Sequence, residues 1–147
     1  MDKKCDYTDL IGRVLIGAIF LFAGYGKIMG FAGTKAYMQM SALGALGATM
    51  VTLLLVLTII LEVVGGIMLI VGYRTRCASY LLAGFVVLAT AFFHMGAGQS
   101  MLMTKNVMIT GGLLVLAANG AGKLSLDAKC AAKEEKAAAK KVANKKK

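Results

Sequence analysis

The sequence contains no proline, a single histidine and only three cysteines among its 147 residues. Without proline no helix has to kink, and the 18 glycines suit straight membrane helices that pack closely through small residues. The single histidine, His94, excludes a haem held by two histidines of one subunit. The cysteines form no Cys-x-x-Cys pair, so the chain has no built-in dithiol redox centre.

Acidic residues are also scarce: seven Asp and Glu stand against 17 Lys and Arg, and the formal net charge is +10. Yet 59% of the residues are hydrophobic, and the mean hydropathy is +0.74. These values are compatible only if charged and apolar residues are segregated along the chain. A soluble domain of this size would expose apolar surface and aggregate. The composition therefore predicts a membrane protein.

Four apolar runs hold most of the hydrophobic residues, at 10–29, 49–72, 78–93 and 106–118. A helix needs about 20 residues to cross the hydrocarbon core of a bilayer. The fourth run is shorter, but Lys105 and Lys123 can reach opposite membrane surfaces and so extend that helix. We predict an all-α fold, an integral membrane four-helix bundle that occupies residues 1–127.

The basic residues predict the orientation of this bundle. Lys27, Lys35 and Lys105 fall on one side of the membrane, and the other 14 of the 17 Lys and Arg fall on the side of the termini. Cytoplasmic loops carry the excess of Lys and Arg. We therefore expect a multi-pass protein of the bacterial cytoplasmic (inner) membrane with both termini in the cytoplasm. The first run is too long for a secretory signal peptide, so we expect an uncleaved span.

Two segments lie outside the four runs. Between the first two runs, Thr34 to Met40 is amphipathic enough to form a short helix along the membrane surface, although an ordinary exposed loop would also fit. Residues 128–147 are rich in Lys and Ala and predict a flexible cytoplasmic tail. The tail either contacts anionic lipid headgroups or serves only as a topology anchor.

Each predicted span carries a stripe of small and polar residues at steps of three or four, which places the stripe on one helix face. We expect these faces to point into the bundle, although they also permit a homo-oligomer. In the second span we assign the opposite face, including Val63 and Ile70, to lipid. The stripes are Arg13, Gly17, Phe20, Gly24 and Lys27; Thr58, Glu62, Gly65, Gly66, Leu69 and Tyr73; Tyr80, Gly84, Val87, Ala91 and His94; and Lys105, Ile109, Gly112, Leu116 and Asn119.

Glu62 stands alone in the middle of the second apolar run. A charged residue at the centre of a membrane helix costs about 2.5 to 3.5 kcal/mol, so it usually faces the bundle interior and marks a site. Depth along the helices leaves Arg13, Lys27 and Lys105 as alternative partners. The pair either locks the bundle or flanks a pocket for a quinone headgroup, a lipid or a small anion.

Two further residues complete the candidate polar pocket, which comprises Glu62, Lys27, His94, Lys105, Asn106 and Arg13. His94 at a helix end is either an interfacial hydrogen-bonding group or a proton relay. Asn106 either joins two helices by a hydrogen bond or lines the pocket. We assign no catalytic residue and no metal site. The sequence shows no nucleotide-binding loop, no Ser or Cys nucleophile arrangement and no nucleic-acid surface.

Several segments resemble the DoxX family of small bacterial membrane proteins. They are Arg13 to Gly17 with Gly24 to Lys27, Leu61 to Gly72 with Arg76, and Lys105 to Asp127. The family usually has a proline just before its second span, where this chain reads Ala-Leu-Gly-Ala-Leu-Gly at 42–47. The resemblance implies a four-helix membrane protein associated with redox enzymes, since members include a subunit of thiosulfate:quinone oxidoreductase and a partner in oxidative-stress membrane complexes.

These observations favour a membrane subunit of a quinone-linked or oxidative-stress-related oxidoreductase complex. Its redox centre would lie on a partner protein, and quinone is the cofactor that the resemblance suggests. The alternatives are a non-enzymatic carrier or binding module for a small molecule, lipid or cargo, and a membrane scaffold that docks soluble proteins.

Overall fold

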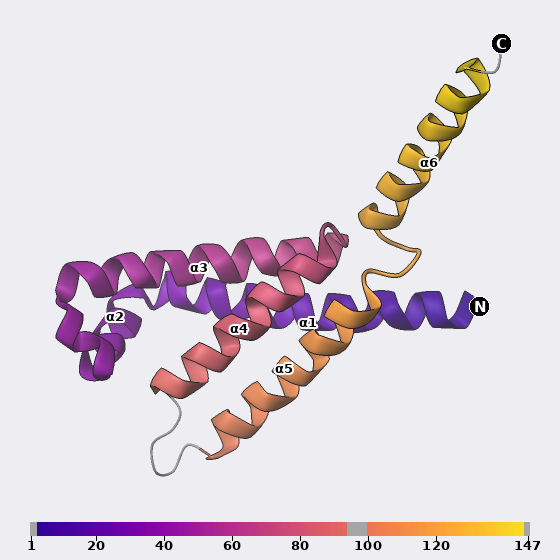
Figure 1. Ribbon diagram of the computed structural model, residues 1–147. Helices are drawn as coiled ribbons and strands as arrows, with labels where there is room; N and C mark the ends of the chain where they lie inside the picture. The colour runs from indigo at the N-terminus through magenta and orange to yellow at the C-terminus, as the bar shows by residue number, and fades with distance from the viewer. Residues whose placement is uncertain (1–2, 94–99, 146–147) are drawn as a thin grey trace.

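A computed structural model describes residues 3–93 and 100–145 of the chain. Within these ranges every regular element is helical, which confirms the all-α prediction. The elements, shown in Figure 1, are α1 (Lys3–Met29), α2 (Phe31–Met40), the short 3-10 helix η1 (Ala42–Leu46), α3 (Ala48–Val71), α4 (Thr75–Phe93), α5 (Ser100–Asn119) and α6 (Leu126–Lys145).

Four of the described helices are long and apolar enough to cross a membrane, and they coincide with the four predicted spans. They are Tyr7–Met29, Ala48–Val71, Thr75–Phe93 and Ser100–Asn119. The fourth extends beyond the start of its short apolar run and includes Lys105, as predicted, but it ends at Asn119, so the predicted extension to Lys123 is wrong. The predicted short helix between the first two spans is also present, as α2.

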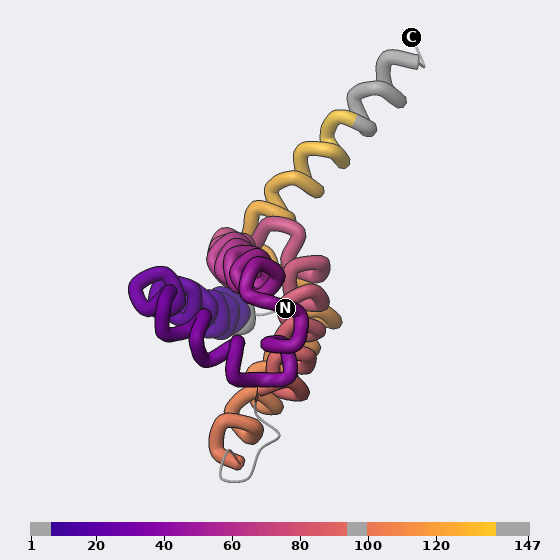
Figure 2. The backbone as a smooth tube through the Cα atoms, turned by 90° about the vertical axis from the view of Figure 1, so that its left-hand side faces the viewer, coloured from indigo at the N-terminus to yellow at the C-terminus, as the bar shows by residue number. Residues whose placement is uncertain are grey.

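The spans form two antiparallel pairs, α1 with α3 and α4 with α5, and contacts between α1 and α5 are sparse. The pairs come together where α3 turns into α4, and they diverge toward the end that α2 and η1 occupy (Figure 1). Figure 2 looks onto that end and shows α2 and η1 crossing between the two pairs. The divergence leaves room between the pairs for a cavity.

Glycines allow α1 and α3 to approach each other closely. A Cβ atom on Gly17 would lie 2.8 Å from the carbonyl oxygen of Gly66, and a Cβ on Gly66 would lie 2.8 Å from that of Gly17. The predicted inner face of the first span is therefore correct. The assignment of Val63 and Ile70 to lipid is wrong, because their side chains cover Gly24 and Gly17 of α1.

The predicted inner face of the third span is also wrong. Tyr80, Gly84, Val87 and Ala91 are exposed, and the buried face of α4 consists of Thr75, Ala78, Ser79, Leu82, Ala83 and Val86. Small residues were the criterion for an inner face, but here the glycine belongs to the neighbouring helix. The Leu82 side chain lies against Gly65 of α3, where a Cβ would come within 2.9 Å of it.

The stripe predicted for the fourth span is correct only in its middle. Lys105 and Asn119 at its ends are exposed, whereas Ile109, Gly112 and Leu116 are half-buried beside the buried Leu113 and Ala117. In the third stripe, His94 lies outside the described residues.

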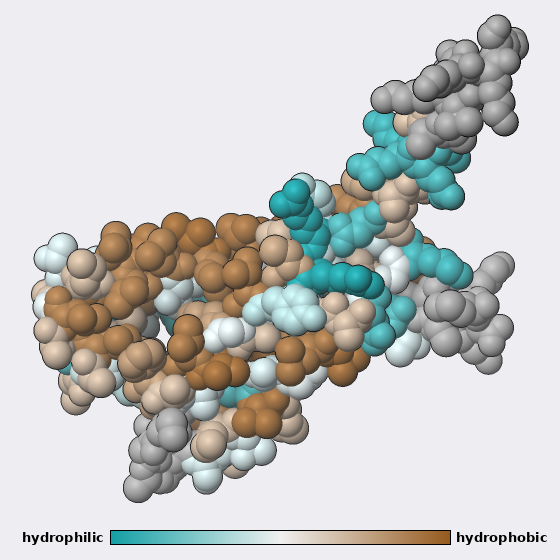
Figure 3. Space-filling model, viewed as in Figure 1, coloured by the Kyte–Doolittle hydropathy of each residue, from teal (hydrophilic) through white to brown (hydrophobic). Residues whose placement is uncertain are grey.

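The end of the bundle near α2 has a small core of its own. Met38 of α2 is buried together with Val51 and Leu55 of α3, and Phe93 at the end of α4 packs against this cluster. At the opposite end α6 leads away from the spans (Figure 1). In Figure 3 hydrophobic residues cover the spans and hydrophilic residues gather where α6 begins. The division into a membrane domain 1–127 and a tail 128–147 stays a prediction.

Candidate functional site

Glu62 and Lys27 form an ion pair between α3 and α1. The Lys27 ammonium donates to both carboxylate oxygens, at 2.7 Å and 2.8 Å. The Glu62 side chain is 5% exposed and the Lys27 side chain 27% exposed. Of the three cations that depth alone left as partners, the structure thus places Lys27 beside Glu62. The bidentate geometry makes this a strong, charge-assisted contact.

The local sequence of α1 explains this pairing. Gly24 lies one turn before Lys27 and lets α3 approach, since a Cβ at Gly24 would come within 3.5 Å of the Glu62 Cβ. The Lys27 side chain therefore starts close to α3 and needs only its own length to reach the carboxylate. A glycine followed three residues later by lysine thus positions the cation.

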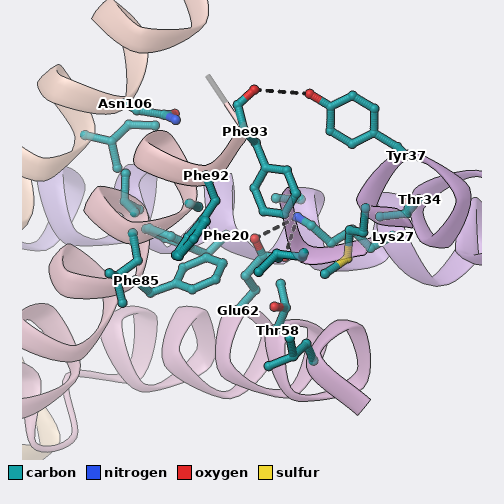
Figure 4. A pocket seen from close by; sticks show the side chains of 18 of the residues that line it. Phe20, Lys27, Thr34, Tyr37, Thr58, Glu62, Phe85, Phe92, Phe93 and Asn106 are labelled. Atoms are coloured by element: carbon teal, nitrogen blue, oxygen red, sulfur yellow. Dashed lines mark hydrogen bonds and ion pairs between the residues drawn. The ribbon is translucent and has the colours of Figure 1, made fainter. Parts of the chain in front are cut away.

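The ion pair lies in the wall of a cavity of about 420 Å³ between the diverging helix pairs. Figure 4 shows Lys27 and Glu62 facing each other among aromatic rings. Polar side chains line only part of the wall, namely those of Thr34, Thr58, Lys105 and Asn106 besides the pair. The aromatic lining consists of Phe20, Tyr37, Phe85, Phe92 and Phe93.

Tyr37 and Phe93 close the cavity at the α2 end. The Tyr37 hydroxyl donates to the Phe93 carbonyl oxygen at 3.3 Å, and the two rings stack with their centroids 5.9 Å apart. This contact joins α2 to the last residue of α4. The arrangement is visible at the top of Figure 4.

The cavity opens sideways between α3 and α4. Leu88 and Phe92 of α4 line it and are also 60% and 48% exposed, so they form its outer rim. Leu54 and Thr58 line it from α3. In Figure 3 a hollow with hydrophilic colouring inside appears between these helices, within a hydrophobic rim. The opening therefore faces the side of the bundle, where lipid chains lie in a membrane.

Asn106 has both of the features that the sequence left as alternatives. Its Nδ2 donates to Thr90 Oγ1 at 2.9 Å, which joins α5 to α4, and its side chain also lines the cavity. Lys105 lines the cavity as well, from an exposed position. The last predicted lining residue, His94, is among the residues that are not described.

Arg13 lies elsewhere, at the end where the helix pairs meet. Its side chain is 1% exposed, and its two terminal nitrogens donate to the carbonyl oxygens of Ala121 and Leu124. Arg13 therefore fixes α1 to the loop between α5 and α6. The structure does not bring it together with Glu62, and Asn119 is likewise remote from the cavity and exposed.

Comparison with known proteins identifies the family. The DoxX family model matches residues 8–95, which include Lys27, Glu62 and most of the cavity wall. The chain belongs to the DoxX family. The family match ends before Lys105 to Asp127, so it does not extend to the segment that completed the resemblance in the sequence.

Two proteins of Escherichia coli strain K12 resemble this DoxX chain over most of its length. It is 38% identical over 130 residues to the inner membrane protein YqjF, covering 86% of this chain and 95% of YqjF. It is 35% identical over 126 residues to the inner membrane protein YphA, covering 80% of this chain and 86% of YphA. No solved structure matches the chain.

The sequence pattern did not lead us to most of the aromatic wall of this DoxX cavity. Phe85, Ala89 and Phe92 recur at steps of four and three, which places them on one face of α4. This spacing could have predicted an inner face of α4, but only small and polar residues were taken to mark an inner face. Within the described residues no group of three or more His, Cys, Asp or Glu is arranged to hold a metal ion.

Proposed function

We propose that this DoxX-family chain binds a quinone-type ring compound in the cavity of the Lys27–Glu62 pair, as the membrane subunit of a quinone-linked or oxidative-stress-related oxidoreductase complex. The observation that supports this most is the combination of a buried ion pair with an aromatic wall and a sideways opening. The volume of about 420 Å³ is within the usual range for small-molecule pockets.

The polar groups suit a ligand with ring oxygens. A lysine ammonium has three donors, and Glu62 receives two, so the third can reach a ligand carbonyl. Thr58 and Asn106 offer further polar contacts in the lining. The Phe20 and Phe93 rings supply flat apolar surfaces against which another ring can pack.

The opening suits a ligand that dissolves in the membrane. An apolar tail attached to the ring would leave the cavity past Leu88 and Phe92 and remain among lipid chains. The ring would reach the ion pair without passing through water. Such a route favours a membrane quinone over a soluble metabolite.

In the proposed reaction a partner protein supplies the electrons, and this chain binds the ring and transfers a proton to it. Conversion of a quinone to a quinol takes up two electrons and two protons. The electrons come from the redox centre of a partner protein. The two protons come from water: Glu62 takes up one and passes it to a ring oxygen, and the other reaches the second ring oxygen directly. Lys27 can stabilise the negative charge that develops on the first ring oxygen.

The proposed location is the bacterial inner membrane. Both E. coli relatives are named inner membrane proteins. The excess of Lys and Arg on the side of the termini supports an orientation with both termini in the cytoplasm. In that orientation the basic helix α6, with Lys129, Lys133 and Lys136, can contact anionic lipid headgroups or an acidic partner.

The sideways opening also favours a second function, that of a carrier which exchanges an amphipathic molecule with the membrane. A carrier would release and rebind its ligand with no electron acceptor present. The redox subunit would require the partner for turnover. Exchange of ligand by the purified chain alone, without a partner or acceptor, would therefore support the carrier.

The test is mass spectrometry of organic extracts from protein purified in nanodiscs of native lipid. We expect stoichiometric quinone with the unchanged chain and loss of quinone in Glu62→Gln. Ala89→Phe, which fills the cavity from α4 without altering the ion pair, should also lose it. Glu134→Gln on the exposed face of α6 makes the same chemical change elsewhere and should retain it. Absence of quinone from the unchanged chain, or equal retention by all variants, would overturn the proposal.

A further inference from the structure

A second hollow, open to the surface and lined by the exposed Arg74, Arg76 and Asn119, lies at the opposite end of the bundle, where α3 turns into α4 and α5 ends. Its lining includes Arg74, Arg76, Asn119 and Asp127, and we call it the arginine pocket. We propose that the arginine pocket binds a phosphate group.

The pocket has positive charge that its own carboxylate does not neutralise. Asp127 accepts hydrogen bonds from the backbone N–H groups of Arg74 and Thr75, at 2.6 Å and 2.9 Å. The carboxylate therefore lies at the N-terminal end of α4, where a negative charge is favourable. Within the described ranges, neither the Arg74 nor the Arg76 side chain forms an ion pair with a carboxylate within 4.0 Å. An anion that enters the pocket meets two guanidinium groups and one carboxylate, which together leave a net positive charge.

The backbone around the pocket is held in an unusual conformation. Arg74 has a φ of +44°, in the left-handed region that a side chain other than glycine adopts at a cost of about 1 kcal/mol. Two contacts hold it there: the Asp127 carboxylate on its N–H, and the Asp127 N–H on the Gly72 carbonyl oxygen at 2.9 Å. Local strain of this kind concentrates at binding sites.

A glycine in the facing loop leaves space for the Arg76 side chain. Gly120 has a φ of +82°, and a Cβ at that position would lie 3.2 Å from Arg76 Nε. The absence of a side chain at Gly120 leaves space for the guanidinium over the loop after α5. Arg76 therefore lies across the pocket against this loop.

The chemistry of these groups matches phosphate. A guanidinium offers parallel N–H donors at the spacing of two phosphate oxygens. Asn119 adds an amide donor to the lining. The pocket lies where α4 begins and α5 ends, so in a membrane it would be level with the headgroups. The phosphate can therefore come from a phospholipid or from a soluble phosphate ester.

The experiment compares Arg74→Gln/Arg76→Gln with Lys133→Gln/Lys136→Gln, which removes the same charge from the exposed face of α6. Binding of phosphatidylglycerol is measured by native mass spectrometry and binding of glycerol phosphate by calorimetry. We expect the arginine variant to bind at least about tenfold more weakly. The lysine variant should lose less affinity than the arginine variant, because α6 lies outside the pocket and can contact only headgroups at the membrane surface. Binding of phosphatidylglycerol alone identifies a lipid, and binding of both probes identifies a site open to soluble esters.

Equal weakening in the two variants, or no weakening in either, would overturn the proposal, because the interaction would then follow net charge alone. Helix content and thermal unfolding, measured by circular dichroism on the same samples, report whether the arginine variant is folded. If it fails to fold, the single variant Arg76→Gln replaces it, since this change leaves the turn at Arg74 intact. The result is independent of the proposed quinone site at the other end of the bundle.

Discussion

Lys27 and Glu62 lie 35 residues apart in the sequence, and the Lys27 ammonium contacts both oxygens of the Glu62 carboxylate. The contact connects α1 and α3 at the point where the cavity wall is otherwise apolar and aromatic. The same two charges therefore join α1 to α3 and belong to the polar part of the proposed site.

Replacement of Lys27 alone should destabilise the protein more than replacement of both partners. Lys27→Met leaves the Glu62 carboxylate buried without its cation, and we expect a loss of about 3 kcal/mol. The double variant Lys27→Met/Glu62→Leu removes both charges and should recover most of this loss. Thermal unfolding in detergent, followed by circular dichroism, measures both. A double variant that loses as much stability as Lys27→Met would contradict this, because the loss would then not come from the unpaired Glu62 carboxylate.

Gly66→Ala should separate α1 from α3. The added methyl group would lie 2.8 Å from the backbone oxygen of Gly17, which cannot move without the helix, and we expect a loss of about 2 kcal/mol. Gly84→Ala is the matched control, because a Cβ there meets no atom within 4 Å. It should be neutral or stabilising by up to about 1 kcal/mol. A similar loss in both variants would contradict close packing at Gly66.

Two hydroxyls on α4 should respond in opposite ways to removal. Ser79 Oγ is buried and has no hydrogen-bond partner among the described residues, so Ser79→Ala should stabilise the protein by about 1 kcal/mol. Thr90 Oγ1 accepts from Asn106 at 2.9 Å, so Thr90→Val should destabilise it by a similar amount, about 1 kcal/mol. Unfolding in the same detergent tests both, and a loss of stability in Ser79→Ala would show that its hydroxyl is bonded in solution.

Asp127 should stabilise the start of α4. Asp127→Ala removes both acceptors from the N–H groups of Arg74 and Thr75, and we expect a loss of about 1 to 2 kcal/mol. Asp127→Asn keeps one acceptor oxygen and should lose less. If the two variants unfold at the same temperature, charge rather than hydrogen bonding would account for the effect of Asp127.

Hydropathy predicted the spans well, because a membrane helix requires a long apolar run wherever it packs. The pairing of helices was beyond this kind of reasoning. Arg13, Lys27 and Lys105 all lay within plausible reach of Glu62, and only the packing of α1 on α3 places Lys27 beside it. The same packing places Arg13 at the other end, bound to carbonyl oxygens of a loop.

The inner face of α4 shows why small residues alone are an unreliable guide. Gly84 is exposed, whereas Leu82 is buried against Gly65 of α3. A close contact needs one small residue, and either helix can supply it. A periodic pattern within one helix does not reveal what the facing helix contributes, so the aromatic wall from Phe85 to Phe92 was also missed.

The two helix pairs converge at one end of the bundle, so the angle between them sets how far apart they are at the other end. The pairs meet where Arg13 holds the loop after α5 and Asp127 holds the start of α4, and they are farthest apart at the cavity. For straight helices, a change in this angle displaces the helix ends in proportion to their distance from the point of convergence. Residues at the converging end, such as Arg13 and Asp127, therefore help to set the width of the cavity opening although they do not line it.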